Sequence, residues 1–421
     1  MCALAGGSLP AAQALEYGPL TLNGFVKLSA SRVSNSCERC QRDPEASRQF
    51  IWADDIVFGK AFGSRNLRSV QVQPTLGLNV DLPEGFKASA AFSQRYRDGE
   101  PDLPGVVYER SASLKHEYYG TVQLGTFLSR GWNRPDFPYA SDLGQTVFSD
   151  AGAAYGILTH ALRYTSRELY VADGNLVLEG SYAQGNTDFK RNKPQFFELW
   201  ALWARGPLVV EAIAQSAHNG APAAFAKAPF TSLTRNAARD DGQLNGNSQG
   251  MFMLLAKYQI GTRYELSGGL RVNRWSGAYA VPLTQGPLAE WNVPFNVHWG
   301  AVDANGIANP GYAARSTDLM LGLRKYLNPK WVAYAGLTHL GKASTANPME
   351  RGQSNSALFA SLGARYEVAD GLTVSASVNA VHYARKGLAP LSMPAHDAFS
   401  NIDSRIAKKG NWLSVEANYR F

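Results

Sequence analysis

Two cysteines three positions apart are the residues whose spacing most directly suggests chemistry. The segment Cys37-Glu-Arg-Cys40 has the spacing of a redox pair, of half a zinc site or of a haem attachment site. Haem attachment requires a histidine directly after the second cysteine, and Gln41 occupies that position. A zinc site would need a second cysteine pair, which the chain lacks. We therefore favour a disulfide between Cys37 and Cys40, formed within a loop in an oxidising compartment.

The histidines suggest neither hydrolysis nor metal binding. They are scattered along the chain as His116, His160, His218, His298, His339, His382 and His396. No G-x-S-x-G or H-E-x-x-H segment accompanies them, so neither a serine hydrolase nor a zinc protease is indicated. We expect no catalytic residue, no metal and no cofactor.

The composition excludes several other classes of protein. Charged residues make up 18% of the 421 residues, below the roughly 25% that is usual for soluble domains. No apolar run approaches the ~18 residues that a transmembrane helix requires. The net charge is +7, but lysine and arginine are spread singly rather than in a basic stripe. We therefore expect no nucleic-acid partner.

The first fourteen residues are typical of an export signal. Ala12-Gln13-Ala14 has the pattern of a signal-peptidase site. We interpret residues 1–14 as the remainder of a signal peptide and residues 15–421 as the mature chain. The alternative is an unstructured N-terminus rich in small residues.

The last residues alternate strictly between apolar and polar. Leu413, Val415, Ala417, Tyr419 and Phe421 share one face of a strand, and Ser414, Glu416, Asn418 and Arg420 share the other. Such a strand offers one face to hydrocarbon and one to water. The same alternation runs through residues 70–82 and 86–93, on either side of a short turn.

The pattern recurs along the whole chain. We predict about sixteen strands that begin at Leu20, Val70, Phe86, Val106, Thr121, Leu158, Leu176, Phe196, Leu208, Met251, Arg263, Thr317, Trp331, Ala357, Leu372 and Trp412. Short turns alternate with long loops between them. A sheet that crosses a bilayer must close on itself, because unpaired backbone groups are costly in hydrocarbon. The predicted fold is all-β: an antiparallel, up-and-down transmembrane β-barrel with short periplasmic turns and long extracellular loops.

A β-helix or sandwich fits less well, because these folds bury apolar side chains and do not call for a polar inner face. In a barrel of this size the polar face surrounds water. Its charged residues then include Arg163, Glu179, Glu198, Glu211, Glu265, Arg271, Asp318, Arg324, Arg365, Glu367 and Glu416. A non-conducting barrel would need a plug segment or an apolar filling, and neither is evident in the sequence.

Four features together carry a resemblance to a known family. They are the first strand Leu20-Thr-Leu-Asn-Gly-Phe-Val26, the alternating connections, a long third loop at residues 132–157, and the ending Asn418-Tyr-Arg-Phe421. In these features the chain resembles the Gram-negative general diffusion porins, in particular the sixteen-stranded, trimeric, beta-proteobacterial type. The resemblance implies an outer-membrane location, a homotrimer, contact with membrane lipid and lipopolysaccharide, and insertion by the barrel-assembly machinery through Tyr419 and Phe421.

The resemblance also implies a pore constriction. In that family the third loop folds into the barrel, and its carboxylates face a basic cluster on the wall. By position the loop acids would be Asp136, Asp142 and Asp150, and the wall bases would be Lys27, Lys87, Arg95, Arg385 and Arg420. The chain departs from the family in having Pro135-Asp136-Phe137-Pro138 where Pro-Glu-Phe-Gly is usual, and in its long first and sixth loops.

The function expected from these features is passive diffusion of small hydrophilic solutes and ions through a water-filled channel, with a mild preference for anions. One alternative is a channel selective for a particular small organic solute. An outer-membrane barrel enzyme or adhesin is a further alternative.

Overall fold

The computed structural model of the chain describes residues 14–34, 66–101, 107–154, 156–184, 195–218, 247–277, 314–345, 356–384, 390, 392 and 409–421. Its strands are β1 (Leu15–Tyr17), β2 (Leu20–Ser34), β3 (Asn66–Asp81), β4 (Lys87–Ser93), β5 (Tyr96–Arg97), β6 (Glu100–Pro101), β7 (Glu109–His116), β8 (Gly120–Leu128), β9 (Ile157–Thr165), β10 (Leu169–Val171), β11 (Gly174–Ala183), β12 (Gln195–Arg205), β13 (Leu208–His218), β14 (Asn247–Ile260), β15 (Tyr264–Gly277), β16 (Ala314–Tyr326), β17 (Trp331–Leu340), β18 (Ser344–Thr345), β19 (Ala357–Ala369), β20 (Leu372–Tyr383) and β21 (Lys409–Arg420). Its helical segments are η3 (Pro83–Gly85), α1 (Arg130–Arg134), η4 (Pro135–Ala140), η5 (Ser141–Leu143) and α2 (Thr146–Asp150).

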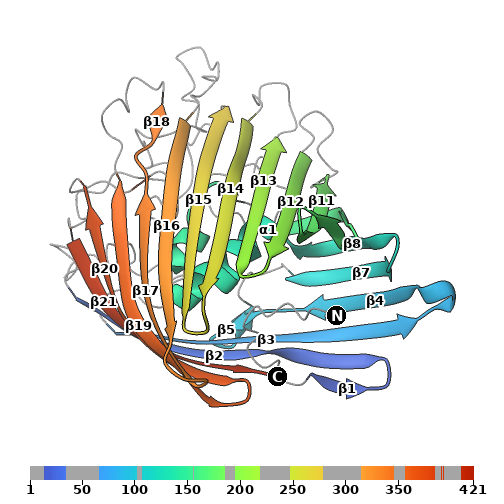
Figure 1. Cartoon of the computed structure of the whole chain (residues 1–421), viewed down its shortest axis with the longest axis horizontal. Coiled ribbons are helices and arrows are strands. Elements are labelled where there is room, and N and C mark those ends of the chain that lie inside the picture. The colour runs from blue at the N-terminus through green and yellow to red at the C-terminus, as the bar shows by residue number, and fades with distance from the viewer. Residues whose placement is uncertain are drawn as a thin grey trace.

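The strands form one closed antiparallel barrel (Figure 1). Neighbours in sequence pair with one another, and β2 pairs with β21 to close the ring. Five short strands extend longer ones: β5 continues β4 along β3, β6 pairs with β5 and leads into β7, β10 continues β9 along β11, β18 continues β17 along β16, and β1 continues β21 along β2. The wall therefore has sixteen strands. All sixteen predicted strands are present, and each begins within four residues of its predicted start.

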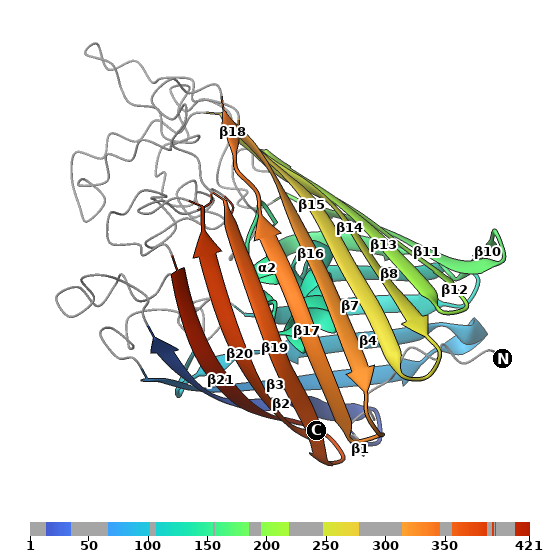
Figure 2. The same cartoon turned by 60° about the vertical axis from the view of Figure 1, so that its left-hand side comes forward.

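The apolar side chains of this barrel face outward, as β16 illustrates. Its residues alternate between buried and exposed along almost the whole strand. The exposed positions include Leu319, Leu321 and Leu323, whereas Asp318 and Arg324 are buried. A soluble protein shows the reverse arrangement, so the outer surface is suited to hydrocarbon. Figure 2 shows β16, β17, β19, β20 and β21 side by side on this wall.

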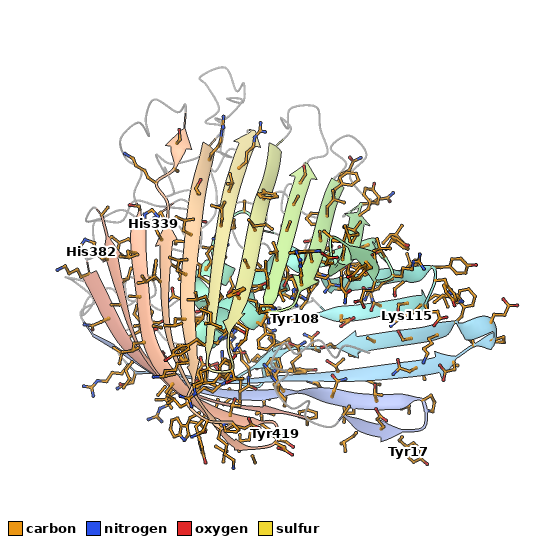
Figure 3. All side chains as sticks on the ribbon, viewed as in Figure 1. Tyr17, Tyr108, Lys115, His339, His382 and Tyr419 are labelled. Atoms are coloured by element: carbon orange, nitrogen blue, oxygen red, sulfur yellow. The ribbon has the colours of Figure 1, made fainter. Side chains whose placement is uncertain are left out.

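Aromatic side chains are exposed near the ends of several strands. Tyr17 is 85% exposed at the end of β1, and Tyr419 is 46% exposed near the end of β21 (Figure 3). Tyr118 and Tyr119, in the turn between β7 and β8, are also exposed. Amphipathic rings at these positions match the aromatic girdles of membrane barrels.

Among the described residues, no helix is both long enough and apolar enough to cross a membrane.

One connection lies inside the barrel. The segment of residues 129–154, here called the inner loop, leaves the wall after β8 and carries α1, η4, η5 and α2. Figure 1 shows these helical segments within the ring of strands. The predicted third loop, residues 132–157, overlaps this segment, but the helical turn begins two residues earlier and Ile157 is already the first residue of β9.

Candidate functional site

The inner loop begins at a turn that the wall fixes directly. The hydroxyl of Ser129 accepts a hydrogen bond from the backbone N–H of Trp132 at 3.1 Å, which caps α1. The buried carboxylate of Glu198 on β12 accepts hydrogen bonds from the N–H groups of Arg130 and Gly131, each at 2.9 Å. These contacts turn the chain from the wall into the lumen.

Two further carboxylates hold the arginines of α1. Arg130 donates two hydrogen bonds to Glu179 on β11, at 2.8 and 2.6 Å. Arg134 makes the equivalent pair of contacts with Glu211 on β13, which also accepts hydrogen bonds from Trp200 at 2.8 Å and from the Tyr139 hydroxyl at 3.2 Å. Three adjacent strands thus each supply one acidic anchor. Burial and the neighbouring Glu211 carboxylate raise the pKa of Tyr139 well above its ordinary value.

The far end of the inner loop is anchored by a buried ion pair. Arg271 on β15 and Asp318 on β16 are fully buried and 2.8 Å apart. Arg271 also donates a hydrogen bond to the carbonyl of Phe148 at 2.5 Å. The N–H of Ala153 donates to Asn273 at 2.8 Å. The loop is therefore fastened to β15 by a backbone acceptor and a backbone donor.

Apolar packing fills the space between the loop and this half of the wall. Tyr139, Ala140 and Phe148 pack into one buried cluster with inward residues of the wall, which include Trp200, Ile213, Met251, Met253, Leu255 and Met320. Gly336 on β17 leaves room for the loop, because a Cβ there would stand 2.9 Å from the carbonyl oxygen of Leu143. The expectation of no apolar filling is therefore wrong, since the inner loop itself covers an apolar patch of the inner wall.

The charges of this half do not face open water as expected from the sequence. Arg163, Glu179, Glu198, Glu211, Glu265, Arg271, Asp318 and Arg324 are all at most 6% exposed. They pair with one another or with the loop. Their inward direction is confirmed, but they hold the loop in place and do not line a passage.

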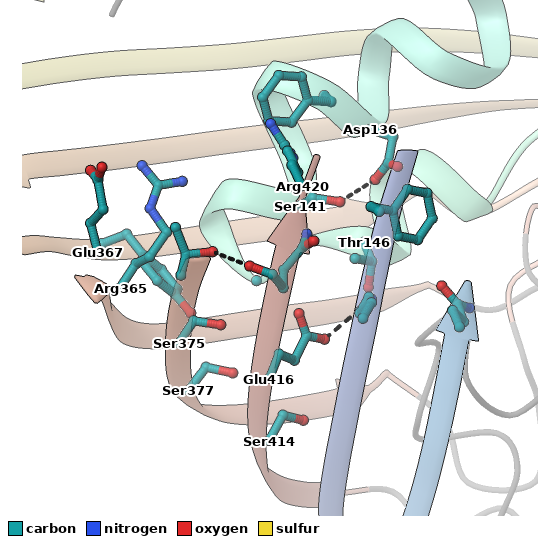
Figure 4. A pocket seen from close by; sticks show the side chains of 18 of the residues that line it. Asp136, Ser141, Thr146, Arg365, Glu367, Ser375, Ser377, Ser414, Glu416 and Arg420 are labelled. Carbon is teal, nitrogen blue, oxygen red and sulfur yellow. Dashed lines mark hydrogen bonds and ion pairs between the residues drawn. The ribbon is translucent and has the colours of Figure 1, made fainter. Parts of the chain in front are cut away.

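A cavity of about 260 Å³ lies between the other face of the inner loop and the opposite wall. The loop contributes Asp136, Phe137, Ser141, Gly144 and Thr146. The wall contributes side chains from β19, β20, β21, β2 and β3, many of them serine, threonine, asparagine or glutamine. Figure 4 shows Asp136 and Ser141 on the loop opposite Arg365, Glu416 and Arg420 on the strands.

The cavity brings together four of the eight residues predicted to form a constriction. Asp136, Lys27, Arg95 and Arg420 all line it. Lys27 also forms an ion pair with Glu416 at 3.4 Å. Asp136 accepts a hydrogen bond from the Ser141 hydroxyl. A loop carboxylate, Asp136, and three wall bases, Lys27, Arg95 and Arg420, therefore line the same cavity.

The other four predicted residues are not part of this group. Lys87 is the first residue of β4 and pairs with Asp81 at 3.4 Å, and both side chains are largely exposed beside the turn. Alternation shows which face of a strand a residue occupies, but not how far along the barrel axis it lies. Lys87 therefore lies at the end of the barrel beside the turn, and not at the constriction as predicted. Asp142 and Asp150 belong to η5 and α2, and their side chains lie outside the described part of the structure, as does Arg385.

Three residues of the cavity lining were not predicted to belong to the constriction, although two of them, Arg365 and Glu367, were predicted to face the lumen. Arg365 and Glu367 on β19 and Phe137 on the inner loop line the cavity together with the predicted residues. The alternation of polar and apolar residues along β19 indicates that Arg365 and Glu367 face inward. No pattern in the sequence indicates that the ring of Phe137 reaches the guanidinium of Arg420, whose central carbon lies 4.8 Å from the ring centroid.

The Cys37–Cys40 pair and the sixth long loop lie outside the described residues, so the disulfide stays a prediction. Within the described ranges, no cluster of three or more histidine, cysteine, aspartate or glutamate side chains is arranged to hold a metal ion.

No protein-family profile and no curated protein sequence matches the chain. Solved structures do resemble it. The anion-selective porin from Comamonas acidovorans has a TM-score of 0.59 at 12% identity, covering 96% of this chain and 99% of that one. The trimer form of OmpT, an outer membrane protein of Vibrio cholerae, has a TM-score of 0.58 at 12% identity, with the same coverage. The outer membrane channel DcaP of Acinetobacter baumannii has a TM-score of 0.56 at 10% identity, covering 96% and 97%. This chain therefore has the sixteen-stranded barrel fold that these outer-membrane porins and channels share.

Proposed function

We propose that the chain forms a water-filled channel in a bacterial outer membrane, through which small hydrophilic solutes and ions diffuse passively. The observation that carries this proposal is a polar, charged cavity between the inner loop and the wall, inside a barrel whose exterior is apolar. Fixed charges beside water attract hydrated ions and dipolar solutes, whereas the exterior suits lipid. A channel accounts for this combination without any catalytic group.

A mild preference for anions is part of the proposal. Four cationic side chains (Lys27, Arg95, Arg365 and Arg420) and three carboxylates (Asp136, Glu367 and Glu416) line the cavity, which gives a formal excess of one positive charge. The excess is small, so both kinds of ion should pass. The Comamonas structure is that of an anion-selective porin, which is in keeping with this preference.

Reversal potentials in planar lipid bilayers test the proposal. Under a KCl gradient the wild type should conduct in discrete steps, with a reversal potential of the sign for anion preference. Arg420→Glu changes the formal charge of the cavity lining from +1 to −1, so the sign should reverse. Arg205→Glu, at the exposed end of β12 outside the cavity, is the control and should leave the reversal potential unchanged. Absence of ion current, or a strong preference of the wild type for cations, would overturn the proposal.

We further propose that the channel is a homotrimer inserted by the barrel-assembly machinery, in contact with outer-membrane lipid and lipopolysaccharide. One solved structure of the same fold is a trimer. The terminal aromatic pair supports recognition by the insertion machinery, because the rings of Tyr419 and Phe421 stack with centroids 6.1 Å apart at the open end of β21. Cross-linking of outer-membrane fractions, followed by electrophoresis without heating, would detect the trimer.

A further inference from the structure

The arginines inside the barrel fall into two groups. Those that hold the inner loop, such as Arg130, Arg134 and Arg271, each contact a carboxylate. Arg95 and Arg420 line the cavity, and within the described ranges neither has a carboxylate within ion-pair distance. Two permanently charged groups therefore face the passage without an acidic partner among the described side chains.

Aromatic rings hold both of these guanidinium groups. The central carbon of Arg95 lies 4.5 Å from the ring centroid of Tyr108 and 5.6 Å from that of Phe25. Arg420 lies over Phe137, and it is the register partner of Phe25 across β2 and β21. A ring beneath a guanidinium contacts its flat face and leaves its N–H edge free to donate. Arg95 already donates a hydrogen bond from Nε to Gln73 at 2.9 Å, so its terminal N–H groups and the N–H edge of Arg420 remain able to bind an oxyanion.

The rings are accessible as well as the charges. Phe25 and Phe137 both line the cavity, and Phe137 is 37% exposed. A solute that enters the cavity therefore meets guanidinium edges and aromatic faces side by side.

The remaining charges limit how many negative charges a solute should carry. The carboxylate of Asp136 lines the same cavity, and the ammonium of Lys27 is already paired with Glu416 at 3.4 Å. A second anionic group on the solute would meet these acids. One carboxylate next to a flat apolar ring fits the lining best.

We propose that Arg95 and Arg420, together with Phe25 and Phe137, form a recognition site for aromatic monocarboxylates in transit. The proposal rests on the channel function proposed above. The carboxylate accepts hydrogen bonds from one or both guanidinium edges, and the ring of the solute packs against Phe25 or Phe137. Binding is transient, because a solute must also leave the site for transport to continue.

Block of the channel current tests this proposal, with benzoate, cyclohexanecarboxylate and acetate as probes. Benzyl alcohol serves as the neutral ring. The current is carried by KCl at moderate ionic strength, since high salt screens the site. The half-blocking concentration of benzoate should be about tenfold lower than that of acetate. Cyclohexanecarboxylate should fall between them, and benzyl alcohol should not block.

Variants separate the charge from the rings. Arg95→Gln and Arg420→Gln should each raise the half-blocking concentration of benzoate about tenfold. Phe137→Leu should remove most of the advantage of benzoate over acetate while leaving block by acetate unchanged. Arg205→Gln, at the exposed end of β12, is the matched control and should behave as wild type. Arg420→Lys keeps the charge but not the planar fork, and it should weaken benzoate block.

Electrophoretic mobility before and after heating shows whether each variant has folded into a barrel. If the wild type conducts KCl but benzoate blocks no better than acetate, the recognition site is refuted and the channel stands. Unchanged benzoate block in both glutamine variants would refute it as well. If the folded wild type conducts no KCl, the channel and the recognition site both fall.

Discussion

The buried ion pair at the far end of the inner loop gives the sharpest stability prediction. Asp318 is fully buried and accepts hydrogen bonds from Arg271 Nε at 3.1 Å and Nη2 at 2.8 Å, and from Asn273 at 2.7 Å. The variant Asp318→Asn keeps the shape of the side chain but removes its charge. Arg271 then remains buried without a counter-ion. Loss of one partner of a buried pair costs about 3–5 kcal/mol.

The expected shift in melting temperature follows from the size of the chain. An unfolding entropy of about 2.1 cal/mol/K per residue amounts to about 0.9 kcal/mol/K for 421 residues. The variant should therefore melt about 3–6 °C below the wild type. The assay is the loss of β-sheet circular dichroism in detergent, at one heating rate for all samples, because the midpoint of irreversible unfolding depends on the heating rate.

An exposed ion pair in the same barrel provides the control. Asp173, in the turn between β10 and β11, and Arg205, the last residue of β12, lie 3.3 Å apart, and their side chains are 73% and 56% exposed. Such pairs contribute about 0–1 kcal/mol, so Asp173→Asn should lower the melting temperature by about 1 °C or less. Equal shifts for Asp318→Asn and Asp173→Asn would refute the reasoning that burial makes the inner pair decisive.

Three further predictions concern other parts of the chain. Gly336→Ala should loosen the inner loop and increase fluctuations of the open-channel current, because the new Cβ would stand 2.5 Å from a loop side chain. Gly180→Ala is the control and should behave as wild type, because its Cβ meets only one leucine methyl, at 3.8 Å. Removal of Phe421 should reduce the amount of folded protein in the outer membrane, measured by electrophoresis before and after heating, because two backbone hydrogen bonds to Gly24 are lost at the closure of the barrel. Alkylation of the unreduced, denatured protein followed by mass spectrometry should leave Cys37 and Cys40 unmodified, and their modification would contradict the predicted disulfide.

The wall of the barrel was predictable because its physics is local. Alternation with a period of two fixes which face of each strand meets lipid, and the short turns fix which strands are neighbours. The predicted strand starts at Leu20, Leu208, Trp331, Ala357 and Leu372 match the structure to the residue. Where alternation is clear, no knowledge of distant contacts is needed.

The site was only partly predictable because it depends on where the inner loop packs. The run Met251 to Ala256 is apolar on both faces, and this is the signal that the inner wall is covered there. The glutamates on β11, β12 and β13 have the same inward phase as pore residues, so their sequence positions do not reveal that they anchor the loop. Lys87 was misplaced for a different reason: its position along the barrel axis depends on strand tilt and register, which alternation does not reveal.

The meeting of β1 and β21 has a consequence for the connectivity of the chain. Phe421 exchanges backbone hydrogen bonds with Gly24, and Leu15 lies opposite Leu22 on the same strand. Ala14 precedes Leu15 and therefore occupies the position opposite Asn23, between Phe421 and Leu15. Phe421 and Ala14 therefore follow one another along a single composite strand, with nearly the spacing of bonded neighbours. A circular permutant could join these two residues and open the chain in an external loop. It would preserve every strand pairing but remove the free terminal carboxylate. Such a permutant would separate closure of the barrel from recognition of the C-terminus by the insertion machinery.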